Sequence, residues 1–306
     1  MSFISEKHSP VATPVTARAS VRRFVADLGE LVKARLTLLV LVTTLMGFLL
    51  AWHGEMNYLY LFHVLCGTAL AAAGAAALNQ VFEVEWDARM NRTRNRPLPA
   101  RRMNLDEGLI IGVICSAAGI IYTSLATNVL TGLFTAVTVG TYLFAYTPLK
   151  RVTTLNTIVG AVPGALPPVI GWTAVRGEAS FESWILFAIL FMWQMPHFLA
   201  ISWLYREQYR SAGFVMLSGH DPDCRLTGRQ ALLYTMGLIS VSLIPAALRL
   251  TTFWYVPVAL VTGAYFFYTA LRFAVTGTER AARKLFIASI VYLPITLGAL
   301  VITRYP

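Results

Sequence analysis

Charged side chains are scarce in this chain. Of its 306 residues, 13% are charged, against about 25% in an ordinary soluble domain, and 57% are hydrophobic. The mean hydropathy is +0.62, and the apolar residues fall in long runs. This composition excludes a soluble enzyme and a disordered chain, and it indicates a polytopic integral membrane protein.

Cysteine is also rare, with only Cys66, Cys115 and Cys224 in the whole sequence. Their wide separation fits neither a disulfide framework nor a C-x-x-C metal pattern, so a disulfide-stapled secreted domain is excluded. A signal peptide is not expected, because the first 35 residues are polar and contain Pro10 and Pro14.

Nine apolar runs each have about the twenty residues that a helix needs to cross the hydrocarbon core of a bilayer. We therefore expect an all-α polytopic membrane protein with nine transmembrane helices. The predicted spans are 36–53, 59–81, 107–125, 128–146, 155–174, 183–203, 230–249, 253–273 and 284–303. Residues 1–35 are expected to form an N-terminal tail, with an amphipathic helix on the membrane surface over 17–35. Residues 36–306 are expected to form a single transmembrane domain.

Positive charge is unevenly divided between the loops. The chain has 25 Lys and Arg against 15 Asp and Glu, a net charge of +10. With the N-terminus in the cytoplasm, all these cations except Arg176, Arg249 and Arg304 fall on the cytoplasmic side. This bias predicts a cytoplasmic N-terminus and an external C-terminus. It also explains the net positive charge, so no nucleic-acid partner is expected.

The end of the second predicted span carries a stripe of oxygen-bearing side chains. Asn79, Glu83 and Asp87 are spaced i, i+4, i+8, which keeps them on one face of a helix. Such oxygens suit Mg²⁺, which is commonly held by one or two carboxylates together with substrate phosphates. The alternative is a solvated helix end whose acids pair with nearby arginines.

Arginines follow directly in the segment 90–99, which reads Met-Asn-Arg-Thr-Arg-Asn-Arg-Pro-Leu-Pro. Guanidinium groups beside metal-binding acids make a site for a metal-bridged polyphosphate, because Arg forks hold phosphate oxygens. The alternative is that Arg92, Arg96 and their neighbours serve only to fix the topology.

Four polar blocks carry a family resemblance. The pattern Asn-x-x-x-acid-x-x-x-Asp followed by Met-x-Arg-Thr-x-x-Arg-Pro-Leu resembles the first motif of the UbiA-type intramembrane prenyltransferases. The blocks at 146–172, 193–198 and 209–230 are similar to the protohaem IX farnesyltransferase branch of that family. In this order, the three blocks contain the sequences Tyr-Thr-Pro-Leu-Lys-Arg, Trp-Gln-Met-Pro-His-Phe and Tyr-x-x-Ala-Gly-x-x-Met-Leu.

The resemblance implies a helical bundle in a bacterial inner membrane whose active site opens to the cytoplasm beneath two polar loops. The implied reaction joins the farnesyl group of farnesyl diphosphate to a vinyl group of haem b, giving haem O and diphosphate. Haem A synthase or terminal-oxidase assembly factors are the implied protein partners. The alternatives are a UbiA-type enzyme acting on a quinone precursor or chlorophyllide, and a secondary transporter.

The resemblance also implies roles for individual residues. Asn79, Glu83 and Asp87 would hold Mg²⁺, with Glu207 as a further ligand because Gln208 stands where the family usually has Asp. The diphosphate and substrate would be bound by Arg92, Arg96, Tyr146, Lys150, Arg151, Asn156 and Tyr209. Asn79, Glu83, Asp87 and Lys150 would be catalytic. Tyr146 and Tyr209 could instead be interfacial tyrosines, and Asn156 could cap a helix.

His197 follows Pro196 inside the sixth predicted span, where an ionisable side chain is expensive and points to function. It is expected to be catalytic, by ligating or orienting the haem iron or by accepting a proton. The alternative is a neutral histidine bonded to a carbonyl that Pro196 leaves free. Gly160, Gly164 and Gly171 are expected to let the backbone approach a flat substrate.

Overall fold

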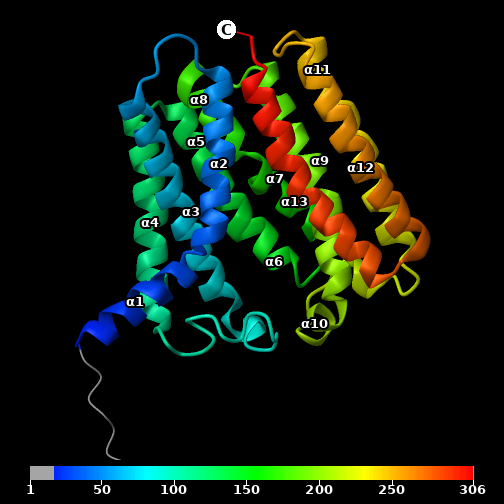
Figure 1. Ribbon diagram of the computed structural model, residues 1–306. Coiled ribbons are helices and arrows are strands. Elements are labelled where there is room, and N and C mark those ends of the chain that lie inside the picture. The colour runs from blue at the N-terminus through cyan, green and yellow to red at the C-terminus, as the bar shows by residue number, and fades with distance from the viewer. Residues whose placement is uncertain (1–16, 306) are drawn as a thin grey trace, which may run out of the picture.

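The computed structural model describes residues 17–305, and this part of the chain is a helical bundle without strands (Figure 1). It has nine helical segments that are long and apolar enough to cross a membrane, which confirms the predicted fold class. They are α2 (Ala34–Ala51), α3 (Tyr58–Asp87), α4 (Leu105–Ala126), α5 to α6 (Val129–Leu149), α7 to α8 (Asn156–Arg176), α9 (Phe181–Leu204), α11 (Arg225–Ala247), α12 (Tyr255–Thr276) and α13 (Glu279–Ile302). Residues 1–16 of the expected tail lie outside the described range.

Local sequence explains where the spans begin and break. Asn57 and Asn128 cap α3 and α5, since each side-chain oxygen accepts a hydrogen bond from the backbone N–H three residues on. The fourth span changes from α5 (Val129–Gly140) to a π-helical turn, η1 (Thr141–Tyr146), before the short α6 (Thr147–Leu149). Pro148 lacks the N–H that the helix needs, which accounts for this turn. Pro167 and Pro168 likewise separate α7 (Asn156–Ala165) from α8 (Pro167–Arg176).

A helix outside the spans, α1 (Ala17–Leu31), lies across one end of the bundle (Figure 1). Leu31 is fully buried against α3 and the loop that follows it. The Gln80 amide of α3 donates hydrogen bonds to the carbonyl oxygens of Glu30 and Leu31, at 2.9 and 2.8 Å. Both carbonyls lie at the end of α1; the Glu30 carbonyl also accepts from the Lys33 N–H at 3.2 Å, whereas the Leu31 carbonyl depends on Gln80. Arg102 adds ion pairs to Asp27 and Glu30. The predicted surface helix is therefore docked firmly on the bundle.

Small residues let the spans pack closely. A Cβ placed at Gly119 of α4 would come within 2.3 Å of the Ala71 nitrogen of α3. Close backbone approach of this kind drives helix association in lipid, where no hydrophobic force acts between helices. The main apolar core joins α8, α9, α11, α12 and α13. Large apolar side chains such as Phe62, Ile114 and Val261 stay exposed on the outside of the bundle, as expected for a lipid-facing surface.

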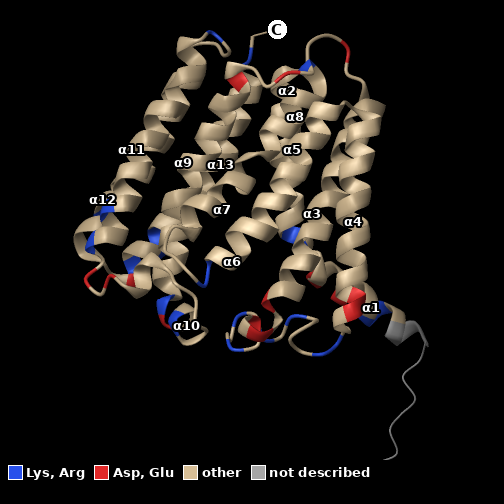
Figure 2. Cartoon of the chain, turned by 180° about the vertical axis from the view of Figure 1, so that it is seen from behind, with Lys and Arg blue, Asp and Glu red and all other residues tan. Residues whose placement is uncertain are grey.

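Charge is concentrated at one end of the bundle (Figure 2). This end carries α1, the loop 88–104 and the loop 205–224, which contains α10 (Arg206–Ser211) and η2 (Leu217–Gly219). The C-terminus lies at the opposite end. We name these the cation-rich end and the far end.

The charge asymmetry predicts the orientation in the membrane. A reporter fused after Pro306 should read non-cytoplasmic, and one inserted in the 89–102 loop should read cytoplasmic, because cationic loops are retained in the cytoplasm. Paired alkaline phosphatase and fluorescent-protein fusions at both sites would measure this. The reverse pattern would place the cation-rich end outside the cell.

Candidate active site

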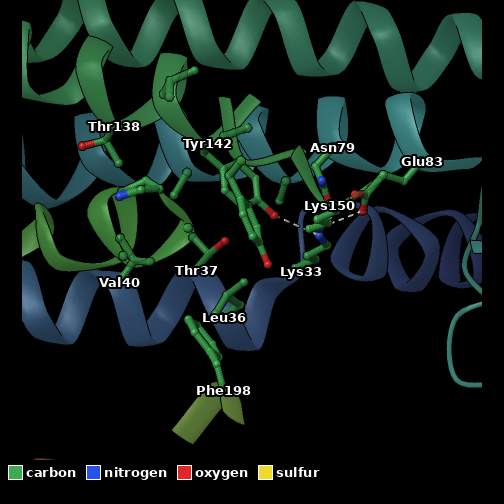
Figure 3. Close-up of a pocket in the computed structure, with 18 of the residues that line it drawn as sticks. Lys33, Leu36, Thr37, Val40, Asn79, Glu83, Thr138, Tyr142, Lys150 and Phe198 are labelled. Atoms are coloured by element: carbon green, nitrogen blue, oxygen red, sulfur yellow. Dashed lines mark hydrogen bonds and ion pairs between the residues drawn. The ribbon is translucent and has the colours of Figure 1, made fainter. Parts of the chain in front are cut away.

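A cavity of about 330 Å³ opens at the cation-rich end of the bundle. Its inner wall is apolar and comes from α2, α3, α5, α8 and α9, with Val40, Ala72, Val139, Ile170 and Phe198 among the lining residues. Its outer part is lined by charged and aromatic side chains. Figure 3 shows Lys33, Asn79, Glu83 and Lys150 gathered at one end, with Phe198 and Leu36 on the wall. The cavity therefore joins a polar head region to an apolar channel.

The stripe predicted on the second span lines this cavity. Asn79, Glu83 and Asp87 lie on the last three turns of α3 and are 1%, 3% and 3% exposed. The structure excludes a solvated helix end, because all three side chains are buried.

Each residue of the stripe meets a cation from another segment. The Lys150 ammonium donates to both oxygens of Glu83, at 2.8 and 3.1 Å. Arg96 forms an ion pair with Asp87 at 2.5 Å. The Lys33 ammonium donates to Asn79 Oδ1 at 2.6 Å, while Asn79 Nδ2 donates to Thr147 Oγ1 and so fixes the amide orientation. The three cations come from a helix corner, a loop and the end of α6.

The charges lining the cavity do not cancel. Four cations, Lys33, Arg92, Arg96 and Lys150, face the two carboxylates Glu83 and Asp87, which leaves a formal excess of positive charge. Guanidinium and ammonium groups hold phosphate oxygens well. The arrangement therefore suits an anionic group with several oxygens.

The stripe also suits a hard divalent cation. One amide oxygen and two carboxylates are the donor types that Mg²⁺ accepts, with substrate phosphates completing its coordination. All three side chains line the same cavity as the basic groups. Because their oxygens are held by cations in the ligand-free arrangement, a metal would have to arrive with an anion that takes those cations over.

Lys33 belongs to the site although it was expected only as one of the cations that fix the topology. Lys33 adopts a left-handed conformation (φ 48°) at the corner between α1 and α2, which turns its side chain into the cavity. Burial, together with the nearby charges of Arg96 and Lys150, lowers the pKa of Lys33 to about 7. Its position directly before the first span was the only available signal.

Lys150 responds differently to a similar environment. Burial alone would lower the pKa of its ammonium, but neighbouring Tyr146 and Glu83 outweigh that effect and hold the pKa above its usual range. Lys150 therefore stays charged, while Lys33 lies close to its titration point at neutral pH.

Tyrosines form one wall of the head region. Tyr146 places its ring 4.4 Å from the Lys150 ammonium, and Tyr142, which sequence analysis missed, lies 3.3 Å from the Lys33 ammonium. Tyr209 accepts a hydrogen bond from Arg92 at 2.9 Å. Tyr142, Tyr146 and Lys150 repeat the i, i+4, i+8 spacing of the α3 stripe that they face, and this pattern could have revealed Tyr142.

The three glycines allow close packing within the protein, and they do not leave backbone open to a flat substrate as expected. A Cβ at Gly160 would come within 2.5 Å of the Tyr146 ring, and one at Gly164 within 2.0 Å of the Gln194 side chain. Gly171 faces the Thr44 carbonyl of α2 in the same way. Gly160 and Gly164 line the cavity and Gly171 does not. The space beside each is taken by the protein itself.

Two polar loops close over the head region. Met90 packs with Ala212, Phe214 and Met216 in one buried cluster that joins loop 88–104 to loop 205–224. The Val215 N–H donates to the Lys150 carbonyl at 2.7 Å. This bond ties the second loop to the residue that pairs with Glu83.

Three residues expected at the site lie outside the cavity lining. The Arg151 guanidinium stacks on the Trp86 ring at 3.9 Å. Asn156 donates to the carbonyl oxygens of Thr153 and Val215, so it holds the loops together. The Glu207 side chain is 78% exposed and lies 4.0 Å from Arg206.

His197 also lies outside the cavity lining, on the side of α9 that faces α13. Its ring stacks on Trp193 and lies beside Phe286, at centroid distances of 4.9 and 5.0 Å. Its Nδ1 is 2.7 Å from Ser289 Oγ. Because the Ser289 hydroxyl donates to the Phe286 carbonyl, it must accept from His197 Nδ1–H. The lone pair of this imidazole is therefore on Nε2, which has no hydrogen-bond partner within residues 17–305.

Comparison with known sequences gives one consistent group of relatives. The profile of the UbiA prenyltransferase family matches residues 40–293. The chain is 44% identical over 287 residues to the protoheme IX farnesyltransferase of Solibacter usitatus, covering 91% of this chain and 98% of that protein. It is 39% identical over 280 residues to the human mitochondrial protoheme IX farnesyltransferase, covering 91% of this chain and 62% of that one.

Solved structures show the same fold. A digeranylgeranylglyceryl phosphate synthase structure aligns with a TM-score of 0.78 at 16% identity, covering 91% of this chain and 98% of that one. A UbiA homologue from Archaeoglobus fulgidus, bound to GPP and Mg²⁺, aligns with a TM-score of 0.63 at 12% identity, covering 90% and 99%.

The lowered pKa of Lys33 predicts proton uptake when an anion binds. At pH 8 the amine is mostly neutral, and a bound phosphate anion favours the charged form and raises its pKa. Binding of inorganic diphosphate should therefore take up as much as about one proton, which calorimetry in buffers of different ionisation enthalpy would measure. Lys33→Met should abolish the uptake. Uptake that persists unchanged in this variant would assign the proton to another group.

Proposed function

Because the chain belongs to the UbiA prenyltransferase family, we propose that it transfers the farnesyl group of farnesyl diphosphate to a vinyl group of haem b. The products are haem O and diphosphate. The relatives named protoheme IX farnesyltransferase support this assignment, because they match along nearly the whole chain.

One structural observation carries the proposal: a head region with excess positive charge continues into an apolar channel within a single cavity. A prenyl diphosphate has the same division into a charged head and an apolar tail. The diphosphate would lie among Lys33, Arg92, Arg96 and Lys150. The farnesyl chain would extend along Ala72, Val139 and Ile170.

The first chemical requirement is a good leaving group. When the bond between farnesyl C1 and the diphosphate oxygen breaks, both electrons leave with the oxygen. Arg92, Arg96 and Lys150 stabilise the charge that develops there, since fixed donors in a water-poor site need no reorganisation. Binding would also shift Arg96 and Lys150 from the acids of α3 to the phosphate oxygens.

Asn79, Glu83 and Asp87 would hold Mg²⁺ once the diphosphate takes over the cations that now pair with them. The metal supplies charge neutralisation of the leaving diphosphate. We leave Glu207 out of this ligand set, because its side chain is exposed outside the cavity.

The allylic cation must be protected from water. Tyr142, Tyr146, Tyr209 and Phe214 line the head region, and Phe198 lies on the cavity wall. Aromatic faces attract cations through their quadrupole, and the packed polar loops exclude solvent.

Bond formation uses the vinyl group of haem b as the nucleophile. Its π electrons make the new bond to farnesyl C1 and leave a cation on the inner vinyl carbon. Water adds to that carbon and loses a proton, which gives the hydroxyethylfarnesyl side chain of haem O. No step changes the oxidation state of the iron.

His197 is proposed to orient the haem through its iron. It adjoins Phe198, which lines the cavity, and the hydrogen bond to Ser289 leaves Nε2 free with its lone pair. A histidine ligand is usually fixed in this way, by a hydrogen bond to its other ring nitrogen. Ser289 then acts as a positioning residue.

The proposed location is a bacterial inner membrane, with the cation-rich end and the mouth of the cavity facing the cytoplasm. The apolar product would pass to haem A synthase or to terminal-oxidase assembly factors. A quinone-precursor or chlorophyllide prenyltransferase would share the head region, so the acceptor is assigned from the relatives and from His197.

Asp87→Asn should reduce Mg²⁺-dependent farnesyl transfer by at least about 100-fold, because it removes a charged ligand while keeping the shape of the side chain. The assay is transfer from labelled farnesyl diphosphate to haem, followed by pigment chromatography across a Mg²⁺ titration. Glu207→Gln is the matched control and should retain near-parental activity. Full activity in Asp87→Asn would remove the α3 stripe from the mechanism, and loss in Glu207→Gln would restore that residue to it.

Haem binding should depend on the hydrogen-bond chain of His197. In the purified protein, His197→Ala should remove the absorption signature of histidine-ligated haem, and Ser289→Ala should weaken haem binding by about 10- to 100-fold. His63→Ala is a suitable control, because His63 pairs with Tyr122 at 2.6 Å between α3 and α4. An unchanged spectrum in His197→Ala would exclude iron ligation by this residue.

A further inference from the structure

A second cavity lies at the far end of the bundle and has no part in the proposed reaction. Its volume is about 280 Å³. It is formed where the ends of α2, α8, α9, α11 and α13 converge. Two backbone hydrogen bonds close one side: Thr252 N–H donates to the Thr303 carbonyl at 2.7 Å, and Tyr305 N–H donates to the Leu250 carbonyl at 3.3 Å.

The three cations that the sequence places opposite the cytoplasm all line this cavity. They are Arg176, Arg249 and Arg304, and Figure 2 shows how few other charged residues lie at this end. Arg304 donates to the carbonyl oxygens of Leu49 and Trp52, which terminate α2. Arg176 contacts His53 Nδ1 at 2.8 Å. Each guanidinium carries more N–H donors than these contacts use.

Two carboxylates line the same cavity without direct ion pairs to the arginines. Glu178 and Glu182 are lining residues. Among the residues that the structure describes, neither forms an ion pair within 4.0 Å with any of the three guanidinium groups. The cavity therefore presents both signs of charge without a direct ion pair between them.

Much of the remaining lining is apolar, and two of its polar atoms, Trp172 Nε1 and Ser180 Oγ, are buried without a hydrogen-bond partner among the described residues. Leu50, Ile185, Leu186 and Leu300 provide hydrocarbon surface beneath the charges. Trp172 is 6% exposed, and its indole N–H is buried without an acceptor. A buried donor without a partner is unfavourable, so an oxygen-bearing ligand that supplies an acceptor is favoured.

We propose that the far-end cavity binds the headgroup of a zwitterionic phospholipid with a primary ammonium. The arginines hold its phosphate, Glu178 and Glu182 hold its ammonium, and the apolar lining meets the start of its acyl chains. Such a headgroup carries both charges on neighbouring atoms and satisfies both halves of the lining. The cavity lies at the ends of the spans, where lipid headgroups are present at high concentration.

The bound lipid would act as a clamp. Helices α2 and α13 come from opposite ends of the chain and meet only sparsely, yet both contribute lining residues. A ligand that binds only the folded bundle raises its stability by mass action. The proposed lipid therefore joins the first and last spans at the end remote from the reaction.

The test is thermal unfolding of the full-length protein in detergent, with native mass spectrometry to count retained lipid. Phosphatidylethanolamine at about 100 times its dissociation constant should raise Tm by roughly 5 °C. Phosphatidylcholine, phosphatidylglycerol, inorganic phosphate and free phosphoethanolamine should each raise it less. Arg249→Gln and Glu182→Gln should each lose most of the gain, while Arg280→Gln, an exposed charge at the cation-rich end, should keep it.

Several results would overturn the proposal. An equal gain with phosphatidylglycerol would show that only the phosphate is recognised, and an equal gain with inorganic phosphate would make this a free-anion site. An unchanged gain in both Arg249→Gln and Glu182→Gln would place the lipid elsewhere on the bundle. Because the readout is stability and bound mass, failure here leaves the proposed farnesyl transfer untouched.

Discussion

The pairing of the α3 stripe with cations from other segments is the interaction on which the rest of the site depends. A buried carboxylate left without a partner costs several kcal/mol, so Glu83 and Asp87 need Lys150 and Arg96 beside them. The same contacts draw the end of α6 and loop 88–104 to the cavity. Asn79 does the same for the corner that carries Lys33. The ion pairs thus place the cations before any substrate arrives. An incoming diphosphate competes for cations that are already in position.

The fold could be predicted because its main determinant is local. The length of each apolar run, compared with the thickness of the bilayer, identifies all nine spans. The polar stripe follows from helix periodicity alone. The point at which the predicted surface helix ends depends on distant contacts. Gln80, far away in the sequence, caps the end of α1 beside the corner at which Lys33 turns into the cavity. No pattern within residues 17–35 contains that information.

A local irregularity of the helix can also give neighbouring side chains different directions. Lys150 reaches Glu83, but Arg151 stacks on Trp86, and both follow the π-helical turn and Pro148. The resemblance implied diphosphate binding for both residues, because the sequence does not show on which side of the chain each side chain lies. His197 and Phe198 are divided in the same way, with Phe198 on the cavity and His197 against α13. The residue types indicated the chemistry at these positions. Only the structure shows which side of its helix each residue occupies.

Charge asymmetry links the two ends of the molecule. At the cation-rich end, arginines and lysines exceed the acids that they pair with, and the surplus favours a strongly anionic ligand. At the far end, three arginines and two glutamates share a cavity without pairing, a balance that suits a ligand carrying both signs. A topological role alone would leave the far-end arginines scattered, since the positive-inside bias requires only that they be few. Their convergence with Glu178 and Glu182 on one cavity is therefore better explained by recognition than by topology.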